Sequence, residues 1–438
     1  MKSDVQYNLD EKYVFSDKSK KNIFIVLIIG IIFFAIGVAM NAFGTGGGEH
    51  HALAFNDPVG TVAGGEHHAT SWTTRLIADL WINTIFFLGI SMIGVFFIAI
   101  QSAAHVGWSA AIKRVPEAFG AFLPFMGIMM IIVFAVGGHD IFHWTHHSLF
   151  EEKLADGTAN PEYDEIIAGK AGFLNPIFFY VTIGFVFVWY FFWTLIRKNS
   201  IAEDQEGGTA RFWKIKTLAT LFIIFLAITS SIGAWMWIMS IDTHWFSTMF
   251  GWYMFASWHV SGLATIALVI MFLKDDGYLK MVNENHLHDL GKFIFAFSIF
   301  WSYVWFAQFL LIYYANIPEE TAYFIDRLSN PTYSKVFFLN IFLNFIFPFF
   351  GLMTRDAKRK TIILKIVCFG VLAGHWIDFY QMVTPGVLKG EGTIGFMELG
   401  LMMIYVAGLA FTIGVNLAKA PLVAKNHPML QESLHHNI

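Results

Sequence analysis

The chain carries little charge for its size. Of its 438 residues only 14% are Asp, Glu, Lys or Arg, whereas 56% are hydrophobic and 18% are aromatic. A soluble domain carries about 25% charged residues, so a soluble surface cannot enclose this much apolar side chain. The net charge of −4 argues against a nucleic-acid partner. We therefore expect an all-α membrane protein whose solvent is the lipid bilayer.

Cysteine is nearly absent, because Cys368 is the only one in the sequence. One cysteine excludes a disulfide within the chain and an iron–sulfur cluster held by this chain alone, since such clusters need several thiolates. It also excludes covalent c-type haem, which needs a Cys-x-x-Cys-His motif. Haem b would need two histidines at matched depth on facing helices, and the sequence favours no such pair. We therefore expect no cofactor bound by this chain alone.

Long hydrophobic runs predict about ten transmembrane helices, since about 20 apolar residues cross the hydrocarbon core. The runs cover residues 22–43, 76–102, 119–138, 176–197, 213–240, 246–273, 290–315, 334–354, 361–381 and 394–418. The first run follows three lysines, as a signal peptide would. It is too long for a signal h-region and no convincing small-x-small cleavage site follows, so we expect the helix to be retained. A cleaved signal peptide is the alternative.

The distribution of Lys and Arg predicts the orientation. With the N-terminus inside and alternating loops, the inside segments hold 22 of the 28 basic residues and the outside segments hold the other 6. Basic residues gather on the cytoplasmic side of membrane proteins. We therefore predict a multi-pass protein of the bacterial inner membrane with both termini in the cytoplasm.

Two long outer loops are predicted, at 44–75 and 139–175. The first carries the string GGEHHA twice, at 47–52 and 64–69, and the second is acidic. Tandem Glu-His-His strings could bind a divalent ion, but a glycine-rich loop that binds nothing is the alternative, and we assign no metal site. The loops are also candidate docking surfaces for periplasmic partners, with plain solvated connections as the alternative.

Polar side chains inside a membrane are costly, so each is a candidate functional residue. At about 1.5 Å per residue, His259 lies about 20 Å from the outer end of the sixth span, near mid-membrane. A smaller group near the inner face comprises His105, Glu117 and Lys292. Most candidates gather toward the outer face, namely Asp79, Asn83, His139, Asp140, His143, Asp242, His244, Gln308, His375, Asp378 and Glu398.

Helical spacing groups some of these residues. His375 and Asp378 are three apart and share a helix face. The histidines of 139–147 form a second stripe at spacing four, if the helix continues past Gly137-Gly138. A His–carboxylate pair that faces a bundle interior could accept and relay protons, because His titrates near neutrality. For histidines at helix ends the alternative is simple contact with headgroups or water.

Two stretches of the chain resemble a known family. They are residues 239–264, MSIDTHWFSTMFGWYMFASWHVSGLA, and residues 288–321, which contain HDLGKFIFAF, QFLLIYY and ANIPEET. Both are similar to signatures of the NrfD-like membrane subunits of alternative complex III, relatives of the polysulfide-reductase membrane subunit. The likeness runs from the second to the tenth span and is greater to the F-type paralogue than to the C-type.

The resemblance implies a division of the chain. Residues 76–240 and 246–381 would form two four-helix bundles. The flanking parts would be a cytoplasmic segment at 1–21, a first helix with its periplasmic loop at 22–75, a last helix at 394–418 and a cytoplasmic tail at 419–438.

The resemblance also implies a function and partners. The chain would be a non-redox subunit of a quinol:cytochrome c or oxidase electron-transfer complex, and would not be catalytic alone. Besides the lipid bilayer, its partners would be the C-type paralogue, an iron–sulfur protein, multihaem cytochromes c and a terminal oxidase. The c-type haems and iron–sulfur clusters would belong to those partners.

We hypothesise that the outer and inner polar groups form proton half-paths with His259 between them. Three alternatives stay open. One is a quinol bound near the periplasmic face, since quinol oxidation needs a base near the ring and a path to water. The second is a purely structural membrane anchor. The third is a free-standing transporter, although Pro124 and Pro348 do not form the matched pair of helix breaks typical of transporter repeats.

Overall fold

The computed structural model describes residues 7–43, 71–154 and 156–437. Those residues contain ten helices that are long and apolar enough to cross a membrane, and no named strand. The all-α membrane architecture that the sequence predicts is therefore confirmed. The tandem histidine strings of the first outer loop lie outside the described residues.

Four spans form the first bundle. They are α2 (Trp72–Ala103); α4 (Leu123–Ile141), preceded by η1 (Ala110–Ile112), α3 (Arg114–Glu117) and η2 (Phe119–Phe122); α6 (Pro176–Glu206); and α7 (Ala210–Trp237), followed by η5 (Met239–Ile241). Helix α2 packs on α4 and α7, and α6 packs on the same two helices.

Four spans form the second bundle. They are α8 (Phe250–Asp275), α9 (Glu284–Ala315), α14 (Thr361–Leu388), and α11 (Pro331–Ile341) continued through the π-helical turn η6 (Phe342–Ile346) into α12 (Phe347–Gly351). Helix α8 packs on α9 and α14, and α14 packs on α11. The bundles meet where α2 contacts α8 and α14. Helices α2 and α8 are accordingly buried nearly all round.

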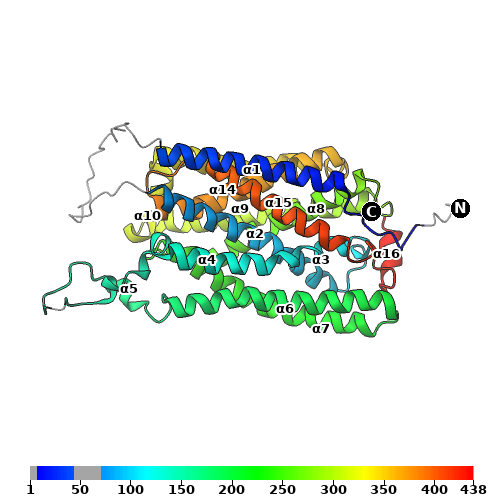
Figure 1. The fold of residues 1–438 in the computed structure, drawn as a ribbon, viewed down its shortest axis with the longest axis horizontal. Helices are drawn as coiled ribbons and strands as arrows, with labels where there is room; N and C mark the ends of the chain where they lie inside the picture. Colours follow the sequence, from blue (N-terminus) through cyan, green and yellow to red (C-terminus); the bar gives the residue numbers. More distant parts are fainter. Residues whose placement is uncertain (1–6, 44–70, 155, 438) are drawn as a thin grey trace.

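Helices α1 (Asp17–Phe43) and α15 (Phe396–Leu417) pack together at the periphery, and Figure 1 shows both along one side of the molecule. Glycines allow their close contact. A Cβ at Gly37 would lie 2.3 Å from the backbone nitrogen of Met397, and one at Gly400 would lie 2.4 Å from that of Phe34. Small residues bring membrane helices together in this way.

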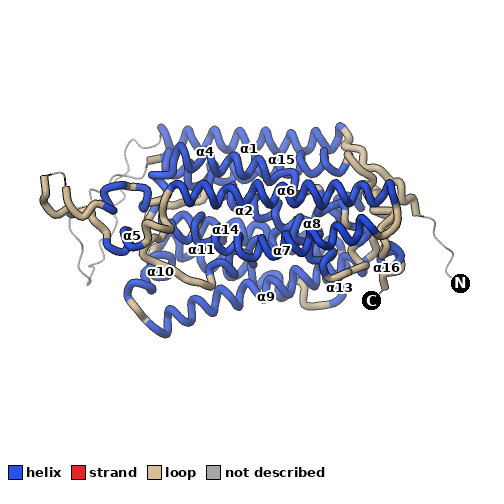
Figure 2. Tube along the Cα trace, turned by 90° about the horizontal axis from the view of Figure 1, so that it is seen from below, coloured by secondary structure: helices blue, strands red, loops and turns tan. Residues whose placement is uncertain are grey.

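The two ends of the molecule differ (Figures 1 and 2). One end carries the first and last described residues of the chain, α13 (Arg355–Arg359) and α16 (Leu430–Leu434), and we call it the termini end. There the N- and C-terminal segments touch, because the Leu422 amide donates to the Glu11 carbonyl at 2.8 Å. The other end, the loop end, carries η3 (His143–Thr145), η4 (His147–Phe150), α5 (Glu165–Gly169) and α10 (Pro318–Ser329).

An Asn-Pro pair starts two of the spans at the loop end. The Asn175 side chain accepts from the Phe178 amide at 2.8 Å, and the Asn330 side chain accepts from the Thr332 amide at 2.9 Å. In each case the following proline has no amide to satisfy and a φ suited to the first helical turn.

Candidate functional site

A pocket of about 400 Å³ opens at the loop end, and we call it the loop-end pocket. It lies among the end of α4, the connection between α7 and α8, helix α10 and the end of α14. Its lining brings together five candidate residues of the sequence, namely His139, Asp140, His143, Asp242 and His244. Glu319, Asp326 and Lys389 add further charge.

The histidine arrangement differs from the predicted helical stripe. Gly137 leaves helical geometry (φ −130°, ψ 18°), α4 ends at Ile141, and Phe142 is extended. The predicted continuation of the stripe to His147 is therefore wrong. The turn instead places the His139 and His146 rings 5.3 Å apart.

The acidic loop is fixed to the α7–α8 connection. His244 Nε2 lies 2.6 Å from Asp164 Oδ2, and the same carboxylate accepts from the Ile166 and Ile167 amides at the start of α5. Burial raises the pKa of Asp164, but these hydrogen bonds together hold it below its usual range. Lys170 adds a hydrogen bond to the Thr243 carbonyl at 2.6 Å.

Arg327 separates the loop-end pocket from the protein interior. It lies on α10 with 3% of its surface exposed, and its guanidinium donates to Asp242 Oδ2 at 3.1 Å. It also donates from Nε to the Gln381 carbonyl at 2.9 Å. That carbonyl lacks its usual helical donor, because Pro385 lies four residues later within α14 and has no amide hydrogen. Arg327 therefore replaces the hydrogen bond that Pro385 removes.

A small cavity continues inward from Arg327. Its volume is about 20 Å³, enough for one water molecule. It shares Trp245 and Tyr323 with the wall of the loop-end pocket. On its inner side it reaches Tyr253 and Asn340, and Gln308 also lines it.

Asp378 lies beyond this cavity and is fully buried. One carboxylate oxygen accepts from the Tyr253 hydroxyl and from Asn340 Nδ2 at 2.8 Å. The other accepts from the Ser257 hydroxyl and from Trp301 Nε1 at 2.9 Å. Four donors from α8, α9 and α11 thus converge on one carboxylate, which offsets much of the cost of burying a charge.

His375 extends this group by one turn of α14. Its Nδ1 lies 3.2 Å from the Ser257 hydroxyl and 3.9 Å from Asp378 Oδ2. Its Nε2 is buried with no hydrogen-bond partner among the described residues. The predicted pairing of His375 with Asp378 on one helix face is thus present.

The asparagines of the eighth span were not among the candidate residues predicted from the sequence. Asn344 lies in the π-helical turn and donates to Asn340 Oδ1 at 2.5 Å, which leaves the amide of Asn340 directed at Asp378. A π turn re-aims side chains and is common at functional sites. The Asn-x-x-x-Asn spacing before Pro348 was the available signal.

Asp79 and Glu398 form a separate group between α2, α14 and α15. Arg75 Nε pairs with Glu398 Oε1 at 2.6 Å. Asn83 donates to Asp79 Oδ1 at 2.9 Å and accepts from Trp376 Nε1 at 3.0 Å. None of these side chains lines the loop-end pocket, so the structure divides the predicted outer group into parts.

His259 lies in an aromatic cage. Its ring is 4.1 Å from Phe297, 5.5 Å from Phe96 and 5.7 Å from Phe255, measured between centroids. Its Nδ1 is buried without a hydrogen-bond partner among the described residues. Within the part of the chain that the structure describes, no hydrogen bond links the His259 side chain to either polar group.

The inner candidates occupy separate environments. Glu117 accepts from Arg114 at 2.6 Å and from the Ser200 hydroxyl. The His105 ring packs between Phe212 and Trp213. Further buried charges surround Glu117, namely Lys113, Arg197, Glu203 and Asp204. This network holds the start of the third span to α6.

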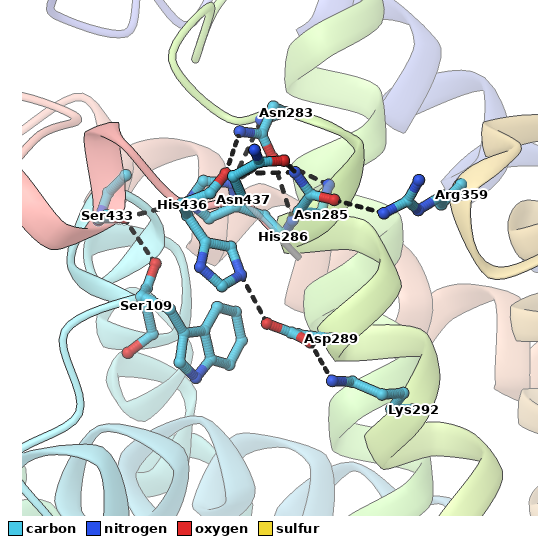
Figure 3. Close-up of polar contacts among 12 residues, drawn as sticks. Ser109, Asn283, Asn285, His286, Asp289, Lys292, Arg359, Ser433, His436 and Asn437 are labelled. Carbon is cyan, nitrogen blue, oxygen red and sulfur yellow. Dashed lines mark hydrogen bonds and ion pairs between the residues drawn. The ribbon is translucent and has the colours of Figure 1, made fainter. Parts of the chain in front are cut away.

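Lys292 belongs to a network that docks the C-terminal tail (Figure 3). Its ammonium pairs with Asp289, whose carboxylate also lies 2.7 Å from His436 Nε2. Asn283 donates to the His436 carbonyl at 2.8 Å, and His286 Nε2 lies 3.1 Å from the Ser433 hydroxyl. The tail thereby covers the start of α9.

No protein-family model and no curated protein matches this sequence. Among the described residues, no three His, Cys, Asp or Glu side chains gather in a way that could hold a metal ion.

Proposed function

We propose that the chain is a non-redox membrane subunit of a quinol-oxidising respiratory complex. In this proposal the loop end faces the periplasm, the termini end faces the cytoplasm, and protons pass between Asp378 and the loop-end pocket.

The observation that carries the proposal is the succession of polar groups from the surface to Asp378. The loop-end pocket and the small cavity share a wall at Trp245 and Tyr323, and the small cavity is lined by two donors to Asp378. Asp378 lies ten residues from the end of α14, which is about 15 Å into the span. A buried carboxylate at the inner end of a polar succession is typical of proton relays in membrane proteins.

Electron transfer is assigned to partner subunits. The sequence has one cysteine, and the structure buries it. The iron–sulfur clusters and c-type haems of such a complex, an iron–sulfur protein and multihaem cytochromes among them, are therefore proposed for other chains. The resemblance at 239–264 and 288–321 supports this division, and the loop-end pocket lies on the side where those partners would dock.

The first experiment is purification of the chain from its own membrane in mild detergent, with a reduced-minus-oxidised visible spectrum. Co-purifying c-type haem and iron–sulfur proteins are the expected result. A colourless protein that purifies alone would refute the complex and favour a transporter.

The second experiment measures protons released per electron by the complex in vesicles. Asp378→Asn should lower this ratio while quinol oxidation continues. Asp79→Asn is the matched control, because Asp79 is also buried near the loop end, but its side-chain donor Asn83 lines neither the loop-end pocket nor the small cavity. An equal ratio in wild type and Asp378→Asn would rule out the proton route and leave a structural anchor.

Quinol binding in the loop-end pocket is the second candidate, favoured by its volume of about 400 Å³ and its histidines. Burial and the neighbouring His146 lower the pKa of His143, which leaves a neutral base beside the pocket. This candidate predicts that His143→Gln or Asp140→Asn confers resistance to a quinol-site inhibitor. Equal inhibition of both variants and wild type would exclude it.

A further inference from the structure

A groove of about 700 Å³ lies at the termini end between the first turns of α1, the end of α8 and the end of α15. Its apolar lining includes the aliphatic residues Ile23, Val26, Val269, Leu273, Ile413 and Leu417 as well as Ala410. Its polar lining residues are Ser16, Lys18, Ser19, Asn22, Asp275 and Asp276. The groove thus has one apolar part and one polar part that carries charges of both signs.

The segment before α1, which lines the groove with Tyr13 and Val14, is held by defined contacts. The Val14 amide donates to the Tyr278 hydroxyl at 3.3 Å, and the Leu279 amide donates to Glu11 Oε2 at 3.0 Å. The Tyr13 and Tyr278 rings lie 5.3 Å apart with an edge-on geometry. These contacts fix the segment before α1 across the end of α8, so the groove is preformed.

The position of the groove indicates that its occupant comes from the bilayer. Helices α1, α8 and α15 are all membrane spans, and only 11% of the apolar window of α1 is buried within the protein. Hydrocarbon chains therefore surround α1, and the aliphatic walls lie at the end of the spans, where lipid headgroups begin.

The charges at the mouth distinguish among membrane lipids. Asp275 is paired with Lys365, whereas Lys18 and Asp276 are both exposed at the mouth. An anionic headgroup would complement Lys18 but would lie beside the carboxylate of Asp276, which is unpaired among the described residues, and that contact is unfavourable. A quinone head is neutral, so it would leave the charges at the mouth of the groove without charged partners. A zwitterionic headgroup complements both signs.

We propose that this groove binds a glycerophospholipid with an amine headgroup, of the phosphatidylethanolamine class. Its ammonium group lies against Asp276, its phosphate lies against Lys18, and an acyl chain fills the aliphatic part. The bound lipid completes the contact of α1 and α15 with the second bundle.

The test is native mass spectrometry of the protein purified from its own membrane. The protein is incubated with equal amounts of phosphatidylethanolamine and phosphatidylglycerol that carry the same acyl chains. The wild-type protein should retain phosphatidylethanolamine in preference to phosphatidylglycerol. Ala410→Phe fills the groove and should reduce that adduct, and Asp276→Asn should reduce the preference about tenfold, as expected for the loss of one charge-assisted hydrogen bond.

The controls are substitutions of the same kind outside the groove. Ala227→Phe lies on an exposed face of α7, and Asp17→Asn lies beside the groove without lining it. Both should bind lipid as wild type does. Asp276→Asn is exposed, so it decides the question even if Ala410→Phe does not fold. Unchanged preference in Asp276→Asn, a preference for phosphatidylglycerol, or an isoprenoid quinone as the retained molecule would each overturn the proposal.

Discussion

The hydrogen bond from Arg327 to the Gln381 carbonyl makes a quantitative prediction. Because Pro385 leaves this carbonyl without a helical donor, Arg327→Leu should leave it buried and unsatisfied. The substitution also removes the cation that pairs with Asp242. In a Pro385→Ala background, the amide of the new alanine can donate to the Gln381 carbonyl, so the same substitution should cost less.

The magnitudes follow from the partners. An unsatisfied buried carbonyl costs about 1–3 kcal/mol. The Asp242 side chain is 23% exposed beside the pocket, so water compensates much of its lost pairing. We expect Arg327→Leu to cost about 2–5 kcal/mol alone. We expect a coupling of about 1–2 kcal/mol with Pro385→Ala, which corresponds to the rescued carbonyl.

A double-mutant cycle in mixed micelles measures this coupling, with unfolding by SDS followed through tryptophan fluorescence. Pro348→Ala is the control, because Pro348 also lies in a span but Arg327 donates to no carbonyl of that span, its acceptors being Tyr323, Asp242, Gln381 and Met382. Arg327→Leu should be additive with Pro348→Ala to within about 0.5 kcal/mol. If Arg327→Leu is additive with Pro385→Ala to within the same margin, that result would falsify the proposed compensation.

Three further predictions test other parts of the structure. Gly37→Leu should cost about 1–3 kcal/mol and separate α1 from α15, which would lower the midpoint of thermal unfolding. Gly184→Leu should be neutral, because a Cβ added at Gly184 has nothing within 4 Å. Equal midpoints for the two variants would refute the close packing of α1 and α15. Glu117→Gln should cost about 3–5 kcal/mol of stability, because it breaks a buried ion pair, and should leave the number of protons released per electron unchanged. A lower ratio of protons to electrons in the same vesicle assay would make Glu117 part of a proton path. Burial and the neighbouring Lys113 lower the pKa of His427 to about 3, below its ordinary value of about 6.5. Protonation of His427 therefore favours release of the C-terminal tail. Docking of the tail should be complete above about pH 6.5 and should weaken as the pH falls toward 3. Limited proteolysis of the tail measures this, and the dependence should be smaller in His427→Phe, which keeps the contact with Phe212.

The ten spans could be predicted because the length of an apolar run is a local property of the chain. Helix α10 was missed because it is short and amphipathic, and no hydrophobic run marks it. Its signals were Pro318 at the first turn, Glu319 and Glu320 beside it, and Arg327 in the last turn. These residues match the preferences of a helix dipole and of a proline start.

The candidate site could be predicted only in part. His375 and Asp378 belong to one helix, so spacing alone placed them together. The donors Tyr253, Trp301 and Asn340 come from three other helices, at separations of 38 to 125 residues from Asp378. No local pattern specifies such contacts.

The sequence by itself determined that this is a membrane protein, how many of its helices are long and apolar enough to cross the bilayer, and which polar residues must be buried at a cost in free energy. Composition and the length of apolar runs decide these properties before any helix meets another. Only the tertiary structure decided how those residues associate. It separated Asp79 and Glu398 from the loop-end pocket, enclosed His259 in phenylalanine rings, and brought Arg327 to the carbonyl that Pro385 leaves free. The physical reason is that a buried polar atom without a partner costs free energy, and the packing of distant helices selects which partners are within reach.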